Sequence, residues 1–243
     1  MIGYLTTYRN NGIFDYELLA RVAVEHNSRK LGLPGRALET PTDSSDNGKR
    51  LYPGTNTVSP FLNRMQVEAM EQTPFDVTIF TDSDFFLASD FLARVARGVG
   101  PNRPLLLLSA RQTLDRFLQP YNDGIDNFPF WSTVLVYYNG TIAKQFFDGV
   151  RKIRAHWQAY ARRFSFSPDI YRNDFAFSLA ASSLRVPYEE ITLPSVYRCI
   201  FTQDQVSSFG NDGPVFEHPS SLDVHAMHKP SLLRSLACNT SEP

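Results

Sequence analysis

The 243-residue chain lacks the features that would assign it to several specialised classes of protein. It has two cysteines, Cys199 and Cys238, without a CxxC pair or zinc-finger spacing, which argues against a disulfide scaffold or a structural zinc site. Its 24 basic and 25 acidic residues nearly balance, so the whole chain has no basic excess for nucleic acid. No run approaches about 18 apolar residues, and no signal peptide is evident. We expect a cytoplasmic protein without a membrane span.

Glycine-rich phosphate loops and internal repeats are also missing from the sequence. Neither G-x-G-x-x-G nor G-x-x-x-x-G-K occurs, which counts against the commonest phosphate-binding loops. Hydrophobic residues make up 42% of the chain and aromatic residues 13%, enough to bury a sizeable core. With no linker visible, we expect one domain spanning 1–243, as a monomer or a small homo-oligomer.

Strand-like and helix-like segments alternate along the first two thirds of the chain. Short apolar runs predict strands at 2–7, 36–40, 74–80, 103–110 and 131–140, and apolar residues at helical spacing predict helices at 14–35, 61–73, 89–99 and 142–164. Asp15 is the expected N-cap of the first helix. This alternation favours an α/β fold with a mixed, mostly parallel sheet flanked by helices.

Two carboxylates, Asp82 and Asp84, follow the strand-like run in "FDVTIFTDSDFF". Ligands of open α/β sheets gather at the carboxyl ends of strands, where this run places both acids. Side chains two residues apart on an extended chain point the same way, roughly 7 Å apart between Cα atoms, so both can bind one divalent cation such as Mg²⁺ or Mn²⁺. The alternative is that they cap the following helix or occupy a turn.

This segment resembles the D-x-D strand end of GT-A glycosyltransferases, whose aspartates hold a divalent metal against the diphosphate of a nucleotide sugar. "YLTTYRNNGIFDYELLARVAVEHNSRK" resembles the first strand, nucleotide loop and helix of the glycogenin-like retaining branch, family eight. "NRMQVEAMEQT" resembles the helix that leads into the D-x-D strand. "HAMHKP" is similar to the C-terminal H-x-x-G-x-x-K-P element, although the glycine is absent and the interval is shorter. The resemblance implies a single GT-A, Rossmann-like domain.

The resemblance also implies a cofactor and a set of ligands. Mn²⁺ or Mg²⁺ and a nucleotide sugar, expected to be a UDP-sugar, are the implied cofactors. Two histidines, His225 and His228, compete for the third metal position; His225 is favoured because it keeps its distance from Lys229, and the choice stays open. A solvated His/Lys cluster is the alternative for this element. The implied donor-binding residues are Thr6, Thr7, Tyr8, Asp43, Arg64, Asp82, Ser83 and Lys229.

A further group of candidates faces the sugar in the resemblance. Asp174 in "YRNDFAFSLA" matches the aspartate of an Asp-Gln helix start, with phenylalanine in place of the glutamine, and is implied to be catalytic. Asn173, Trp131 and Ser132 are implied to contact the substrate. The alternatives are that Asp174 or Asn173 caps a helix and that Trp131 belongs to the core.

The expected function is therefore a metal-dependent glycosyltransferase of the hexosyltransferase class that retains anomeric configuration, with a donor-binding half at 1–110 and an acceptor half at 111–243. Acceptor recognition is not legible from the fold. The stretch 149–168 contains five basic residues and no acid before Asp169, which could attract the phosphates of DNA. The small chain also resembles bacteriophage enzymes that modify DNA. A hydroxymethylated DNA base is therefore one expected acceptor, and a phage enzyme would act in the cytoplasm of its host. A solvated helix face is the alternative interpretation. A protein or glycan acceptor, a metal-dependent nucleotidyltransferase and a non-catalytic sugar-binding domain remain the alternatives.

Overall fold

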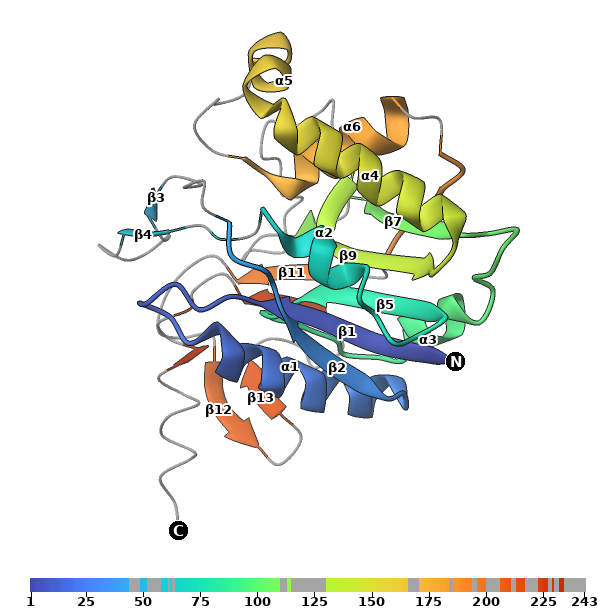
Figure 1. Ribbon diagram of the computed structural model, residues 1–243. Helices are drawn as coiled ribbons and strands as arrows, with labels where there is room; N and C mark the ends of the chain where they lie inside the picture. Colours follow the sequence, from blue (N-terminus) through green and yellow to red (C-terminus); the bar gives the residue numbers. More distant parts are fainter. Residues whose placement is uncertain are drawn as a thin grey trace.

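The computed structural model describes the chain in segments, and a six-stranded sheet forms its centre (Figure 1). The described residues are 1–43, 49–51, 58–60, 62, 64–109, 113–114, 130–165, 171–183, 186–193, 196–199, 206–210, 213–216, 223–226, 229 and 232–233.

The central sheet has the order β10-β7-β9-β5-β1-β2. Its strands are β1 (Ile2–Tyr8), β2 (Gly35–Glu39), β5 (Val77–Asp82), β7 (Leu105–Ser109), β9 (Phe130–Tyr138) and β10 (Glu189–Ile191). Five of them run in one direction and β9 alone is antiparallel to both of its neighbours, which confirms the expected mixed, mostly parallel sheet. All five residues of β7 are buried, because helices cover both faces of the sheet.

Helices pack on both sides of this sheet, and each side has its own apolar cluster. Helices α2 (Gln66–Met70), α4 (Thr141–Ala155), α5 (Trp157–Arg163) and α6 (Asn173–Ser183) lie on one face, while α1 (Tyr16–Leu31) and α3 (Phe91–Ala96) lie on the other (Figure 1). Asp15 caps α1 as expected, because its Oδ1 accepts from the backbone N–H of Leu18 at 2.9 Å. Gly32 ends the helix at φ 65°, a left-handed conformation that favours glycine.

The helix expected at 142–164 is interrupted, so that prediction was wrong about its continuity. At His156 the backbone turns to φ −113° and ψ 25°, and the His156 N–H is shared between the carbonyls of Lys152 and Ile153. The apolar spacing continues across the break, since Ile153 and Trp157 are both buried, and periodicity alone therefore gave no sign of it. The helix expected at 61–73 is described as the shorter α2.

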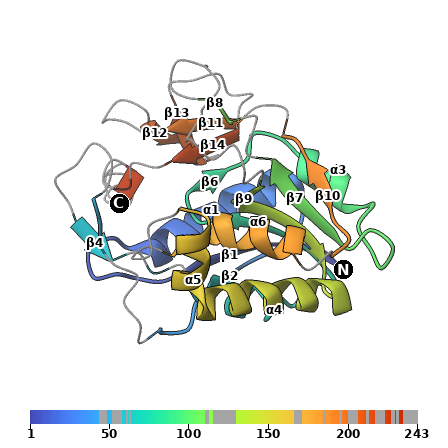
Figure 2. The same ribbon diagram turned by 90° about the horizontal axis from the view of Figure 1, so that it is seen from above.

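A second sheet of four strands lies to one side of the central sheet (Figure 2), and it begins with β6, the strand that follows β5 in the chain. Its order is β6 (Phe85–Phe86), β14 (Asp223–Ala226), β11 (Val196–Cys199) and β8 (Thr113–Leu114). Two smaller pairs complete the described structure: β3 (Lys49–Leu51) with β4 (Val58–Pro60), and β12 (Val206–Gly210) with β13 (Gly213–Phe216). The sheet containing β6 carries the C-terminal segment back to the D-x-D residues.

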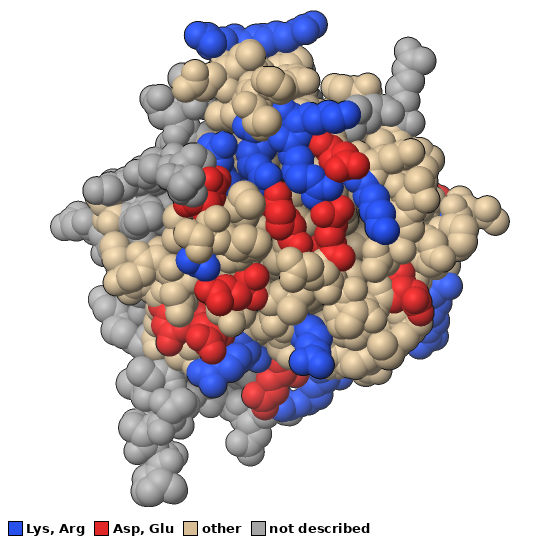
Figure 3. Space-filling model, in the orientation of Figure 1, with Lys and Arg blue, Asp and Glu red and all other residues tan. Residues whose placement is uncertain are grey.

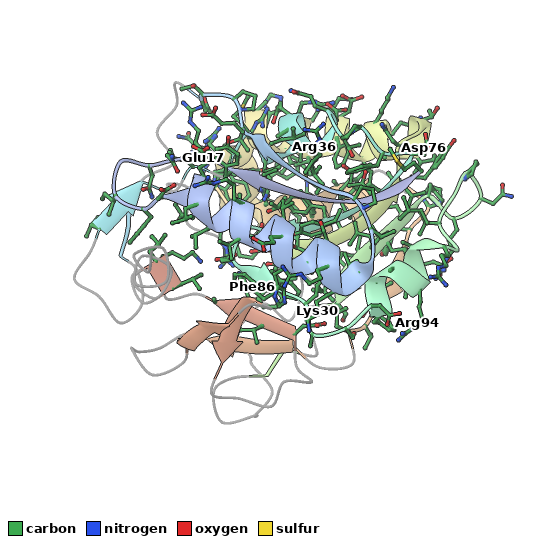
Figure 4. The ribbon with its side chains drawn as sticks, turned by 90° about the horizontal axis from the view of Figure 1, so that it is seen from below. Glu17, Lys30, Arg36, Asp76, Phe86 and Arg94 are labelled. Carbon is green, nitrogen blue, oxygen red and sulfur yellow. The ribbon has the colours of Figure 1, made fainter. Side chains whose placement is uncertain are left out.

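The strand β6 returns the chain to the core directly after Asp84. Phe85 is fully buried, and Phe86 packs against Leu19 and Ala23 of α1 (Figure 4). In the described part of the chain, no helix has the length and apolar character that crossing a membrane requires.

Candidate metal and donor site

Asp82 and Asp84 lie where β5 leaves the central sheet. Asp82 is the last residue of β5 and is in register with Thr7 of β1. Asp84 is buried immediately before β6. Since β1 and β5 are parallel, their carboxyl ends meet at this edge, and the acids therefore stand beside the end of β1, where the expected nucleotide loop begins.

His225 reaches the two aspartates through strand pairing. β14 is antiparallel to β6 with His225 opposite Phe85, and the Ala226 N–H donates to the Asp84 carbonyl at 2.8 Å. The His225 Nε2 lies 3.3 Å from Asp84 Oδ1. One ligand atom each from Asp82, Asp84 and His225 lies within 4.8 Å of the others. The structure thus brings together three of the four expected metal ligands; His228 lies outside the described residues.

Lys229 is buried at the same site and forms an ion pair with Asp84 Oδ2. Its Nζ also donates to the Ala226 carbonyl at 3.1 Å. The favoured arrangement, with His225 on the metal side and a separate lysine beside it, is therefore compatible with the geometry. Trp131 is buried and packs edge-on against the His225 ring, with 5.2 Å between ring centroids.

Asp82 has an environment different from that of Asp84. Burial raises the pKa of Asp82, while neighbouring His225, the hydrogen bond from Gln66 and Lys229 oppose the shift. The Gln66 Nε2 donates to Asp82 Oδ1 at 2.9 Å, and the Gln66 Oε1 accepts from Asn173 Nδ2 at 2.6 Å. Gln66 was missed in the sequence, because a glutamine in a helix carries no signal of a contact 107 residues away.

Asp174 is held as an ionised carboxylate close to the metal candidates. The Ser132 N–H and Oγ–H both donate to Asp174 Oδ1, at 2.9 and 2.8 Å, and Arg172 Nη2 donates to Oδ2 at 2.8 Å. Burial would raise the pKa of Asp174, but Arg172 and the Ser132 donors outweigh it and lower the pKa below its ordinary value. Helix α6 begins at Asn173, whose amide faces Gln66. Arg172 was not among the expected site residues.

The expected donor residues divide into a strand group and a paired group. Thr6, Thr7 and Tyr8 form the end of β1, with Thr6 and Thr7 buried; Ser83 is also buried. Arg64 Nε lies 3.1 Å from Asp43 Oδ2, and its guanidinium stands 5.4 Å from the centroid of the Tyr171 ring. The structure therefore joins Arg64 and Asp43 in one ion pair, which the sequence analysis did not foresee.

The basic stretch on α4 and α5 is partly neutralised by neighbouring acids (Figure 3). Arg151 pairs with Glu71 and with Asp148, each at 2.5 Å. Arg154 pairs with Glu68 at 2.5 Å and donates to the Arg64 carbonyl at 2.6 Å. Two of the five basic side chains considered for phosphate are thus engaged by the protein itself. Lys152, Arg162 and Arg163 complete the stretch.

The side chains of Asp82, Asp84 and His225 are suitable ligands for a divalent cation. Two carboxylates and an imidazole converge, and two of the three side chains are buried, a combination suited to Mn²⁺ or Mg²⁺. Without a cation the carboxylates repel each other by about 4 kcal/mol at 4 Å for an effective dielectric near 20. Lys229 compensates Asp84, but in the described part of the chain no lysine or arginine pairs with Asp82. The geometry is that of a site able to accept one more positive charge.

Comparison with proteins of known structure identifies the fold of the chain. No protein-family model matches the chain, and no curated protein matches it. It is similar to a glycosyltransferase involved in the glycosylation of the major capsid of PBCV-1, with 13% identity, 98% of each chain covered and a TM-score of 0.51. The chain has a GT-A fold.

Two weaker similarities of the GT-A chain carry no conclusion. Galactosyltransferase LgtC is 11% identical, with 99% of this chain and 97% of LgtC covered and a TM-score of 0.47. A 4-diphosphocytidyl-2C-methyl-D-erythritol synthase from Anaerococcus prevotii is 9% identical, with 98% of each chain covered and a TM-score of 0.40.

Proposed function

We propose that this chain is a metal-dependent glycosyltransferase that moves a sugar from a nucleotide-diphosphate sugar, in the first place a UDP-hexose, with retention of configuration. Residues 1–110 supply most of the donor site, and residues 111–243 supply the acceptor side and the C-terminal metal and phosphate element. The convergence of Asp82, Asp84 and His225 at the carboxyl end of β5, from segments far apart in the sequence, carries the proposal.

Each residue of the site has a distinct task in the proposed reaction. Asp82, Asp84 and His225 would hold Mn²⁺ or Mg²⁺, which when bound neutralises charge on the departing diphosphate. Lys229 is a compact cation beside Asp84 that can bind a phosphate oxygen. Arg64 and Asp43 are the polar pair for the nucleotide. Trp131 is buried and packs edge-on against the proposed metal ligand His225, where its ring can also contact the sugar.

Asp174 is the proposed catalytic carboxylate. Its lowered pKa keeps it ionised at neutral pH, and an ionised carboxylate can stabilise the positive charge that develops at the anomeric carbon. Ser132 and Arg172 hold both of its oxygens, so the carboxylate keeps one orientation. Such preorganisation means that no reorientation is required as the charge develops.

The experiment that tests the function is calorimetric titration of nucleotide sugars in the presence and absence of Mn²⁺. The expected result is Mn²⁺-dependent binding of one donor, lost in Asp82→Asn, which preserves side-chain volume. Asp90→Asn is the matched control, because Asp90 is a half-exposed acid paired with Arg94 on α3. No binding of any nucleotide sugar by the folded wild type, with Mn²⁺ present, refutes the proposal.

Product analysis then separates the finer alternatives. Transfer to hydroxymethylated DNA, to protein or to a glycan identifies the acceptor, and a DNA acceptor requires a steep loss of affinity with salt. Release of pyrophosphate from a nucleoside triphosphate and a sugar phosphate identifies a nucleotidyltransferase instead. Donor binding with neither hydrolysis nor transfer identifies a sugar-binding domain. Nuclear magnetic resonance of the first product assigns the anomeric configuration.

A further inference from the structure

The carboxamide of Gln66 connects the metal candidates to helix α6. Gln66 is buried, its Nε2 donates to Asp82 Oδ1 at 2.9 Å, and its Oε1 accepts from Asn173 Nδ2 at 2.6 Å. Asn173 is 1% exposed. An ionised carboxylate only accepts hydrogen bonds and an amide nitrogen only donates them, so the two contacts together fix which way the Gln66 amide faces.

Helix α2, which carries Gln66, is held from two other elements. Arg154 of α4 donates to the Arg64 carbonyl at 2.6 Å and to Glu68 Oε2 at 2.9 Å. Tyr137 of β9 donates to the Met70 carbonyl at 2.6 Å. A helix of five residues is not stable alone, so these contacts determine where it stands. Gln66 is therefore presented to Asp82 from a fixed support.

The absence of charge on the Gln66 amide, which donates the hydrogen bond to Asp82, matters as much as the position of that amide. A lysine or arginine at this place would orient Asp82 but would also neutralise it and compete with a metal ion. A neutral amide orients the carboxylate and leaves its negative charge for the cation. Asp84 shows the contrast, since its partner in the structure is the ammonium of Lys229.

We propose that Gln66, held by Asn173, is a positioning residue that orients Asp82 for divalent cation binding. This role rests on the proposed function, because it needs Asp82 to be a metal ligand. Asn173 directly precedes Asp174, so the same support links the metal site to the proposed catalytic carboxylate. Asn173 then acts on the metal through Gln66, in place of the substrate contact that the family resemblance implies.

The test measures Mn²⁺ affinity, with the metal alone, by the electron paramagnetic resonance signal of free Mn²⁺. Gln66→Met keeps the side-chain volume and removes both amide contacts, and the expected loss of affinity is about 10-fold, as for outer-shell partners of metal ligands. Asn173→Leu should lower the affinity less, since Gln66 stays in place but loses its orientation. The double variant should be no weaker than Gln66→Met alone, because both act along one path.

The matched control is Gln72→Met, which changes an exposed glutamine just beyond α2 and should leave the affinity unchanged. Thermal unfolding of each variant separates positioning from a general loss of structure. If Gln66→Met does not fold, Asn173→Leu takes its place, with several-fold weaker binding expected.

Three outcomes distinguish the hypotheses. If the folded wild type does not bind Mn²⁺, the metal site itself is refuted and the role of Gln66 with it. If the wild type binds Mn²⁺ and a folded Gln66→Met binds it equally well, the positioning role alone is refuted. Fully additive effects of Gln66→Met and Asn173→Leu would also overturn it, because Asn173 would then act independently of Gln66.

Discussion

Removing the Asp84 charge should destabilise the fold more than any surface change, independently of its effect on activity. The side chains of Asp84 and Lys229 are only 8% and 6% exposed, so Asp84→Asn removes the carboxylate that forms an ion pair with a buried ammonium. Such a loss typically costs 3–5 kcal/mol, which is a large part of the roughly 5–15 kcal/mol that stabilises a domain. His225 loses the same carboxylate, which adds to the effect.

The assay is urea unfolding without metal at pH 7, followed by tryptophan fluorescence. With a slope of about 2–3 kcal/mol per molar urea, the midpoint of Asp84→Asn should fall by roughly 1–2 M. The double variant Asp84→Asn with Lys229→Met should recover much of this, because the buried ammonium is then removed together with the charge of Asp84.

Glu25→Gln is the control for this measurement, since it breaks an exposed ion pair with Arg29 and should change stability by less than about 1 kcal/mol. An Asp84→Asn midpoint within the range of the Glu25→Gln control would refute the reasoning. A double variant no more stable than Asp84→Asn would refute it equally. The result also decides whether lost activity in Asp84 variants reports on chemistry or on folding.

Two further predictions concern the packing of strands β1 and β2, which contain Tyr4 and Gly35. Gly35→Ala should destabilise the protein by about 1–3 kcal/mol in urea unfolding, because the added Cβ would lie 1.9 Å from Ser28 Oγ. Adding Ser28→Ala should restore part of the lost stability. A Gly35→Ala variant as stable as the wild type would contradict this close approach. Burial raises the pKa of Tyr4 to about 12, so Tyr4 stays protonated in the folded state while it ionises near 10 when unfolded. The contribution of Tyr4 to stability is therefore complete below pH 10 and is lost as the pH rises toward 12. The free energy of unfolding should fall between pH 9 and pH 11, and it should fall less in Tyr4→Phe than in the wild type. Equal falls in the two proteins would contradict the prediction.

Local patterns were sufficient to predict the central elements of the fold. The apolar run that forms β7 reads as a strand buried on both faces, and Asp15 reads as a helix cap, because each signal depends on residues within one turn or one strand. The break at His156 could not be predicted, since the buried positions of Ile153 and Trp157 keep helical spacing across it.

The site was predictable only where its chemistry is local. Asp82 and Asp84 end a strand, and that context pointed to a cation from the sequence alone. Arg172 lies only two residues before its partner Asp174, so that ion pair is local, although a basic residue at this spacing does not by itself indicate a site. Gln66 contributes through a contact that the tertiary structure creates, since its partner Asn173 lies 107 residues away. The pairing of Arg154 with Glu68 likewise joins residues 86 apart, which changes an apparent phosphate-binding charge into a support for α2.

The three carboxylates of the site differ in how the protein compensates their charge, and this difference locates the place for a cation. Lys229 compensates Asp84, and Arg172 compensates Asp174. Asp82 receives a neutral amide, burial raises its pKa, and nearby Asp174 raises it further. An added divalent ion therefore gains most at Asp82, since within the described residues no lysine or arginine forms an ion pair with it and Lys229 is paired with Asp84. For this reason Asp82→Asn is expected to weaken Mn²⁺ binding with little cost in stability, while Asp84→Asn should impair both.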